Sequence, residues 1–382
     1  MTQLHPISIY LHWPFCESKC PYCDFNSHVR QKIIQHDWLL GFQKNIQEWF
    51  VKFEKPTIKT IYFGGGTPSL MEPSVVSNII NNIYKYNSVN EYVEISLEVN
   101  PSSFEIEKFK DYASAGVNRI SIGVQSFIDN DLKRLGRLHT AKEAISAIET
   151  SLNLFENVSF DLIYGRQYQK IKDWENELKF ALSLGNQHLS LYQLTIEENT
   201  TFGKLFVKGK LKGLPCEILS SQYFQITNEI CSSHGFNPYE ISNFSLSGYE
   251  CEHNLNYWRC GNFLGIGPGA HGRYQISNNR FTYENIKNPE KWLQKSTSGY
   301  LSISNKTKIS KIEHCEEYVI MGLRLMEGID LIWIKETFGM HFNVDKLNHL
   351  INLKLIEVSG NRLKVLQKGR VLLNQIIKEL LI

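Results

Sequence analysis

Short runs of apolar and β-branched residues recur six times along the first half of the chain, and hydrophobic residues at helical spacing lie between them. The six runs begin near Ile7, Ile58, Tyr92, Asn118, Asn157 and His188. Strands that alternate with helices indicate βαβ units and a parallel α/β sheet. Six such units form either a doubly wound open sheet or a partial β/α barrel, and both bind ligands at the carboxyl ends of the strands.

The same pattern predicts the connecting helices. They cover residues 74–86, 104–115, 141–155 and 171–184. Past Glu197 the pattern changes. One helix is predicted over residues 216–235, whereas residues 239–272 show no clear period and predict an ordered functional loop region.

The last part of the chain is helical again. Helices are predicted over residues 313–325, 331–338, 344–353 and 368–381, with a hairpin that turns at residues 359–361. Helices combined with a hairpin resemble a winged-helix module. We therefore expect a partial six-unit β/α barrel over residues 1–200, a loop-rich extension over residues 201–300 and a winged-helix-like domain over residues 301–382.

Charge and composition exclude several classes of protein. The chain has 41 Lys and Arg against 39 Asp and Glu, so it does not cover nucleic acid with positive charge, and no nucleic-acid partner is expected. A charged fraction of 21% with 12% aromatic residues excludes a mostly disordered chain. Residues 301–382 carry 12 basic and 9 acidic residues, an excess that favours a packing or partner-docking domain over DNA binding.

The sequence contains no obvious membrane or export signal. No apolar run reaches the roughly 18 residues needed to cross a bilayer. The first 15 residues lack a basic segment followed by a long apolar stretch. We therefore expect a cytoplasmic protein without a transmembrane segment, for which transient contact with a membrane stays open.

Three of the eight cysteines crowd into eight residues directly after the first predicted strand. Cys16, Cys20 and Cys23 have the spacing C-x3-C-x2-C. Four thiolates saturate a [4Fe–4S] cluster, whereas three leave one iron free to bind a cofactor or substrate. The alternative is a zinc site with His12 or His28 as a fourth ligand, and spacing alone leaves that alternative open.

This motif at the start of a six-unit βα array resembles the radical S-adenosylmethionine (SAM) superfamily. The resemblance implies that the amino and carboxylate groups of SAM chelate the open iron. It also implies that an electron donor reduces the cluster, which then cleaves the sulfonium to give a 5′-deoxyadenosyl radical.

Polar and glycine residues at the other strand ends are candidates for holding SAM. The candidates are Gly64, Gly65, Gly66, Thr67, Glu98, Gln125, Arg137 and Asp161, and Tyr10 of the first predicted strand is a further candidate. Glycines allow the backbone to approach the methionine part, and a guanidinium suits a carboxylate. Each residue taken singly fits an ordinary capping or loop role, but their recurrence at corresponding strand ends favours a cofactor site.

The wider motifs resemble the oxygen-independent coproporphyrinogen III oxidase family over nearly the whole chain. They are the segment from Tyr10 to Cys16 (YLHWPFC), GGGTPS, EVNP, GVQSF and DLIYG. Two features place the chain nearer to the haem chaperone branch than to the oxidases. Phe25 stands where the oxidases have a further cysteine, and the segment from His253 to Trp258 (HNLNYW) matches the H-N-x-x-Y-W motif of the chaperones.

The resemblance implies a protein that binds a [4Fe–4S] cluster, SAM and haem, and delivers haem to acceptor haemoproteins such as respiratory enzymes. The alternative is the oxidative decarboxylation of coproporphyrinogen III. His253 is the leading haem-contact candidate, because imidazole ligates haem iron. Other possibilities are His271 as a contact, a metal site of Cys251, His253 and Cys260, or a histidine that is simply packed in a loop.

The sequence departs from the family after DLIYG. The family continues with Leu-Pro-Gly-Gln, whereas this chain has Arg166, Gln167, Tyr168 and Gln169. The tight Pro-Gly turn is missing, so we expect a differently shaped loop near Asp161, at the adenine end of the SAM site.

Overall fold

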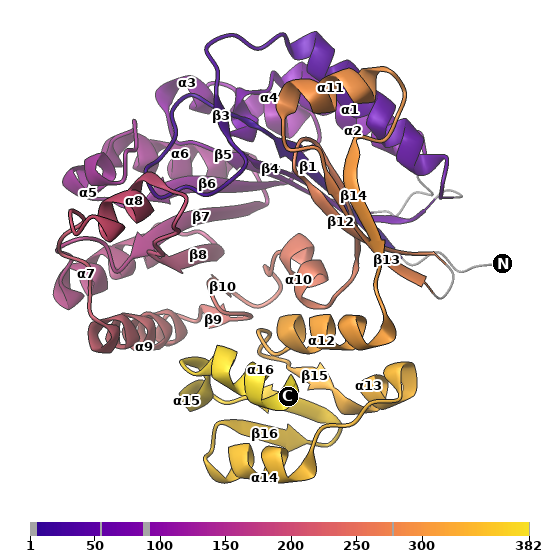
Figure 1. Ribbon diagram of the computed structural model, residues 1–382. Coiled ribbons are helices and arrows are strands. Elements are labelled where there is room, and N and C mark those ends of the chain that lie inside the picture. Colours follow the sequence, from indigo (N-terminus) through magenta and orange to yellow (C-terminus); the bar gives the residue numbers. More distant parts are fainter. Residues whose placement is uncertain (1–5, 54–55, 87–91, 277–278, 382) are drawn as a thin grey trace.

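The computed structural model describes residues 6–53, 56–86, 92–276 and 279–381. It shows a curved sheet with helices on its outer face, and a smaller C-terminal unit below the open side of the curve (Figure 1). The six predicted strands are β1 (Ile7–Trp13), β4 (Ile58–Gly65), β5 (Glu94–Val99), β6 (Arg119–Gln125), β7 (Asn157–Tyr164) and β8 (His188–Gln193). They lie side by side in chain order and are all parallel. The sheet does not close, which confirms the partial barrel.

The outer layer contains the predicted helices and several that the pattern did not predict. The helices of this half are α1 (Gln35–Phe50), α2 (Pro73–Tyr84), α3 (Ser103–Ile106), α4 (Phe109–Ser114), α5 (Asp129–Arg134), α6 (Ala141–Leu154) and α7 (Ile171–Leu182), with the 3-10 turn η1 (Pro68–Leu70). The predicted helix over residues 104–115 is therefore two short helices. Thr140 caps α6 through a reciprocal bond pair with Glu143.

Residues 201–300 are not loop-rich, which corrects the prediction. They contain the helices α8 (Thr201–Val207), α9 (Glu217–Ser233), α10 (Glu252–Trp258) and α11 (Pro289–Thr297), and the strands β9 (Asn237–Pro238), β10 (Asn243–Ser245), β11 (Asn262–Ile266), β12 (His271–Ile276) and β13 (Asn279–Asn285). β11 pairs with β1 in parallel, and β12 and β13 extend the sheet beyond it. β9 and β10, with two and three residues, are too short for an alternation that can be recognised in the sequence.

The C-terminal unit matches the predicted helices and hairpin closely. It comprises α12 (Lys311–Gly322), β15 (Ile329–Asp330), α13 (Leu331–Phe338), α14 (Val344–Asn352), β16 (Ile356–Ser359), β17 (Arg362–Val365), α15 (Gln367–Arg370) and α16 (Leu373–Leu381). Three strands in the order β15-β17-β16 form a separate small sheet over a separate apolar core. The unit begins after residue 308, since β14 (Ile303–Lys308) pairs with β13 in the large sheet.

The core of the barrel braces the strand that carries the cysteine segment. Trp13, at the end of β1, is fully buried and packs edge-on against Trp38 of α1. Trp38 stacks in turn on Trp292 of α11, with ring centroids 5.8 Å apart. Burial of aromatic side chains of this size is a major source of stability. Among the described residues, no helix has both the length and the apolar character that a bilayer crossing demands.

Candidate functional site

A cavity of about 470 Å³ lies at the carboxyl ends of the parallel strands. Most of the predicted site residues line it: Cys16, Cys20, Cys23, Gly65, Gly66, Thr67, Glu98, Gln125, Arg137 and Asp161. They come from segments up to about 145 positions apart in the sequence and meet because parallel strands end at one edge of the sheet. Gly64, Tyr10 and His253 lie outside this cavity.

The three cysteines lie on one loop, and a short pair of strands joins the two ends of this loop. Cys16 ends β2 (Phe15–Cys16), which pairs with β3 (His28–Val29) across the base of the loop. Within the loop the amide of Cys23 donates to the carbonyl of Cys20 at 3.1 Å. Burial raises the pKa of the Cys16 and Cys23 thiols. These thiols are therefore protonated unless a cation or a metal offsets the cost of burying their charge.

The glycine turn fits closely against this loop. The amide of Gly66 donates to the carbonyl of Trp13 at 2.7 Å. A Cβ atom on Gly66 would lie 2.6 Å from the carbonyl oxygen of Phe15 and 3.0 Å from the Cys16 sulfur. Only glycine permits this approach. Gly64 is different, since a Cβ there would lie 2.8 Å from the ring of Tyr10, behind the cavity.

Arg137 provides a positive charge beside the thiols. Its Nη1 lies 3.6 Å from the Cys20 sulfur, and its Nη2 donates to the Asn100 side chain at 2.7 Å and to the Gly123 carbonyl at 2.8 Å. Its buried Nε has no hydrogen-bond partner among the described residues. A guanidinium with a spare buried donor fits an anionic ligand in the cavity. Asn100, in the motif EVNP, was missed as a site residue although it orients this guanidinium.

Two carboxyl groups face the same cavity. Burial, with the nearby charge of Asp161, raises the pKa of Glu98 to about 7, and burial raises the pKa of Asp161 to about 6. Tyr62 Oη donates to Glu98 Oε1 at 2.9 Å. Carboxyl groups that titrate near neutrality can accept hydrogen bonds from hydroxyl or ammonium groups of a ligand, or donate when protonated.

The loop after β7 keeps a turn despite its unusual sequence. Tyr168 adopts a φ of +62° at the position where the family has glycine. Buried Arg166 pairs with Asp131 at 3.0 Å and with Glu177 at 2.5 Å. A buried arginine clamp therefore takes the place of the rigid proline turn. Gln125 is also strained, at a φ of +70°, and its carbonyl accepts from Arg166.

His253 is buried behind the cavity, with 1% of its surface exposed. Its Nδ1 shares a hydrogen bond of 2.6 Å with Thr60 Oγ1, and its Nε2 shares one of 2.8 Å with Tyr257 Oη. Burial lowers its pKa to about 3, so the imidazole is neutral. Contact with haem iron would require one of these bonds to break. Tyr10 lies beside this group, with its ring 6.4 Å from that of His253.

The alternative metal sites are not assembled in the part of the chain that the structure describes. It contains no group of three or more His, Cys, Asp or Glu side chains that could hold a single ion. His12 has both ring nitrogens engaged, by Tyr10 Oη at 3.1 Å and the Asn26 carbonyl at 3.0 Å. An iron–sulfur cube spreads its irons over several ångströms, so its three thiolates need not converge on one point as zinc ligands do.

Comparisons with known proteins agree with this architecture. Residues 10–181 match the family model of the radical SAM superfamily, and residues 309–372 match the HemN C-terminal domain. Coproporphyrinogen III oxidase (HemN) from Escherichia coli has the same fold, with a TM-score of 0.83 and 21% identity over 99% of this chain and 90% of that one. The chain thus contains a radical SAM domain followed by a HemN-type C-terminal domain.

Relatives along the whole chain define the family more narrowly. Heme chaperone HemW of Haemophilus influenzae is 33% identical over 99% of this chain and 98% of its own length. HemW of Bacillus subtilis is 33% identical over 97% of both chains. The mitochondrial radical S-adenosyl methionine domain-containing protein 1 of Dictyostelium discoideum is 38% identical over 98% of this chain and 94% of its own. The chain belongs to the HemW family, which confirms the resemblance seen in the sequence.

Proposed function

We propose that the protein is a haem chaperone that carries a [4Fe–4S] cluster and SAM, binds haem and delivers it to acceptor haemoproteins, including respiratory enzymes. One observation carries the proposal. Ten residues that fit a cluster and SAM surround one cavity, on a chain related over its whole length to proteins named as haem chaperones. All eight cysteines are free, which fits a reducing compartment such as the cytoplasm.

The residues around the cavity suit distinct parts of these cofactors. Cys16, Cys20 and Cys23, which all line the cavity, would hold three irons of the cluster and would leave the fourth iron for SAM. Gly65, Gly66 and Thr67 would receive the methionine part of SAM. Glycine is needed at the first two positions because a Cβ atom there would lie within 2.7 Å of the chain segment that leads into the cysteine loop. The remaining candidates contact SAM by hydrogen bonds; these are Glu98, Gln125, Arg137 and Asp161. When reduced by an electron donor, the cluster supplies an electron to SAM.

Arg137 has a double role in this arrangement. Its Nη1 lies 3.6 Å from the Cys20 sulfur, so its positive charge is next to one of the proposed cluster ligands. Its unpartnered Nε can donate to the carboxylate of SAM. The side chain therefore links the cluster ligands to the cofactor that completes the iron site.

The cluster is tested by anaerobic reconstitution with iron and sulfide. We expect about four irons per chain and the brown absorption of an iron–sulfur cluster in the wild type. Cys20→Ala should lose both signals, whereas Cys216→Ala, at an exposed cysteine outside the cavity, should retain them. Zinc in place of iron, or a Cys20→Ala variant with a full iron content, would contradict the proposal.

Haem binding is tested by titrating the reconstituted protein with haem and following the Soret band. We expect a shifted band in the wild type and weaker binding in His253→Ala, which removes either the iron ligand or the support of Tyr257. His271→Ala measures the second imidazole candidate, and His349→Ala on α14 is an exposed control. A wild-type spectrum in which the Soret band does not shift would contradict the assignment of the protein as a haem chaperone. Anaerobic conversion of coproporphyrinogen III to protoporphyrinogen, with release of 5′-deoxyadenosine, would establish the oxidase alternative.

A further inference from the structure

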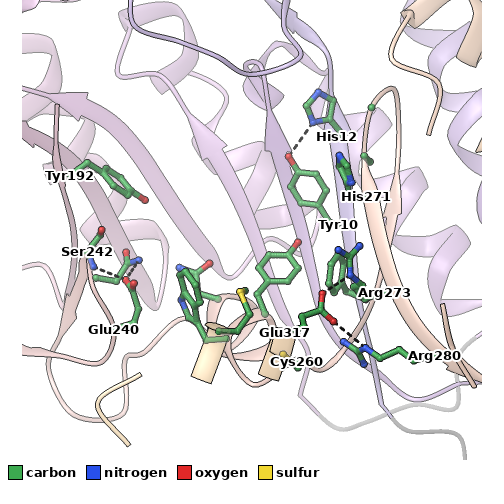
Figure 2. A pocket seen from close by; sticks show the side chains of 18 residues that line it. Tyr10, His12, Tyr192, Glu240, Ser242, Cys260, His271, Arg273, Arg280 and Glu317 are labelled. Carbon is green, nitrogen blue, oxygen red and sulfur yellow. Dashed lines mark hydrogen bonds and ion pairs between the residues drawn. The ribbon is translucent and has the colours of Figure 1, made fainter. Parts of the chain in front are cut away.

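A second and larger cavity, of about 740 Å³, lies between the barrel, its sheet extension and the C-terminal unit (Figure 2). α10, β11 and β12 contribute to its walls, and α12 of the C-terminal unit adds Glu317 and Met321. Its volume is in the range of about 300–1,000 Å³ that is usual for sites of small organic ligands. It is distinct from the cavity of about 470 Å³ that the three cysteines line (the cysteine cavity), although Tyr192 lines both.

One wall of this second cavity is apolar and aromatic. Tyr257, Trp258 and Phe263 line it, and the rings of Tyr257 and Phe263 meet edge to face at 4.5 Å. Tyr257 is fixed from behind by its hydrogen bond to His253. Rigid aromatic surface of this kind suits a flat, apolar macrocycle.

The opposite character appears where the sheet extension meets α12. Arg273 of β12 and Arg280 of β13 both contact the Glu317 carboxylate, at 2.7 Å and 3.4 Å, as the dashed lines in Figure 2 show. Arg280 is 6% exposed. Two guanidinium groups therefore share one carboxylate. The Glu317 carboxylate balances one of the two positive charges, and the other positive charge stays unbalanced at this end of the cavity.

We propose that this second cavity holds the haem, with the two propionates received by Arg273 and Arg280. This inference rests on the proposed function, and it names the propionates as the groups of the haem that the protein recognises. Haem is a flat apolar ring with two carboxylates on one edge, which matches an aromatic wall next to a pair of arginines. Guanidinium groups bind carboxylates in a bidentate manner, and such bonds are among the strongest polar contacts in partly buried sites.

The experiment compares haem with its dimethyl ester, in which both propionate charges are removed. The full-length wild type should bind haem at least about tenfold more tightly than the ester. In the double variant Arg273→Gln with Arg280→Gln, haem affinity should fall at least about tenfold and the preference for the free acid should vanish. A merely structural effect would weaken both ligands and leave their ratio unchanged.

Matched variants keep the test independent of folding. Arg259→Gln removes a nearby arginine that pairs with Glu327 and does not line the cavity, so the preference for haem should persist. The triple variant Arg273→Gln, Arg280→Gln and Glu317→Gln also removes the carboxylate that the double variant leaves without a cation. It should show the same loss of preference for haem over the ester. A wild type that binds both ligands equally, or a double variant that keeps the preference, overturns the inference. A wild type that binds neither ligand contradicts the proposed function itself.

Discussion

Tyr168 holds a backbone conformation that its side chain disfavours. Its φ of +62° lies in the left-handed region, where a Cβ atom costs about 1–2 kcal/mol. The ring is exposed and lies beside Arg134, with the guanidinium carbon 5.4 Å from its centroid. The turn therefore persists without the glycine, because the surrounding contacts fix it.

A pair of substitutions isolates this backbone cost. Tyr168→Gly and Tyr168→Ala both remove the ring, so they differ only in the Cβ atom. We expect Tyr168→Gly to be more stable by about 1 kcal/mol in the free energy of urea unfolding. At Gln167, where φ is negative, the same pair should show the reverse order. Equal stabilities of the two Tyr168 variants would mean that the turn relaxes.

Glu98 should make the cofactor-free protein less stable at alkaline pH. Its pKa is raised from 4.5 to about 7, so the folded state holds the proton more tightly than the unfolded chain. The resulting stabilisation is complete below pH 4.5 and is lost as the pH rises through 7. Glu98→Gln should therefore gain on the order of 3 kcal/mol over the wild type at pH 8 and well under half of that at pH 5, because one pKa unit corresponds to about 1.4 kcal/mol.

Denaturation in urea at both pH values measures this effect. Glu107→Gln, at an exposed position of the same barrel, is the control for the substitution itself. A Glu98→Gln variant that gains nothing at pH 8 would mean that the carboxyl group is already ionised without cost in the folded protein.

The sequence was most informative where one residue type is chemically distinctive. The cysteine spacing and the polar strand ends led directly to the residues around the cysteine cavity. It was least informative for His253, because the burial of its ring and the engagement of both nitrogens depend on Thr60, which is 193 positions away. Arg273 and Arg280 gave no signal either, since their proximity arises only when β12 pairs with β13.

At the scale of elements, Arg166 joins the loop after β7 to two helices. It bonds to Asp131 of α5 and to Glu177 of α7, and its Nη1 also donates to the carbonyl of Ile163 at 2.7 Å. Glu177 in turn accepts from the amide of Phe127 at 2.8 Å, two residues after the end of β6. One guanidinium thus organises the edge of the cysteine cavity near Asp161.

Arg166→Leu, which restores the residue typical of the family, should destabilise this chain. Two buried carboxylates would lose their shared cation, and breaking a buried pair in this way costs about 3–5 kcal/mol. Lys172→Met removes an exposed pair with Glu175 and should cost less than about 1 kcal/mol. Thermal and urea unfolding measure both, and a cost below 1 kcal/mol for Arg166→Leu would show that the clamp is dispensable.

The pattern of the chain predicted the regular elements well and the short ones poorly. All six barrel strands and the helices and hairpin of the C-terminal unit lie where they were expected. Residues 239–272 were predicted as a loop region, yet they form α10 and part of the sheet. Their strands are completed by partners elsewhere in the chain, such as β1 and β8, so local sequence has little information about them.

At the scale of the whole molecule, the two cavities should work independently. The cysteine cavity is lined by residues between 16 and 197, whereas the second cavity also draws on the extension and the C-terminal unit, and Tyr192 is the one described residue that lines both. Losing the cluster through Cys20→Ala should change haem affinity by no more than about twofold. The double arginine variant should retain the iron content of the wild type. A large change in either cross-measurement would reveal coupling between the sites.

The position of β1 in the sheet bears on how the protein matures. β1 is bonded on one side to β4 and on the other to β11, so the strand that leads into the cysteine loop is braced along both edges. The barrel can therefore form around its own hydrophobic interior before any iron arrives. A newly made chain would then be folded before the cluster is inserted. Cluster insertion would be a late step of maturation, and folding would not depend on it.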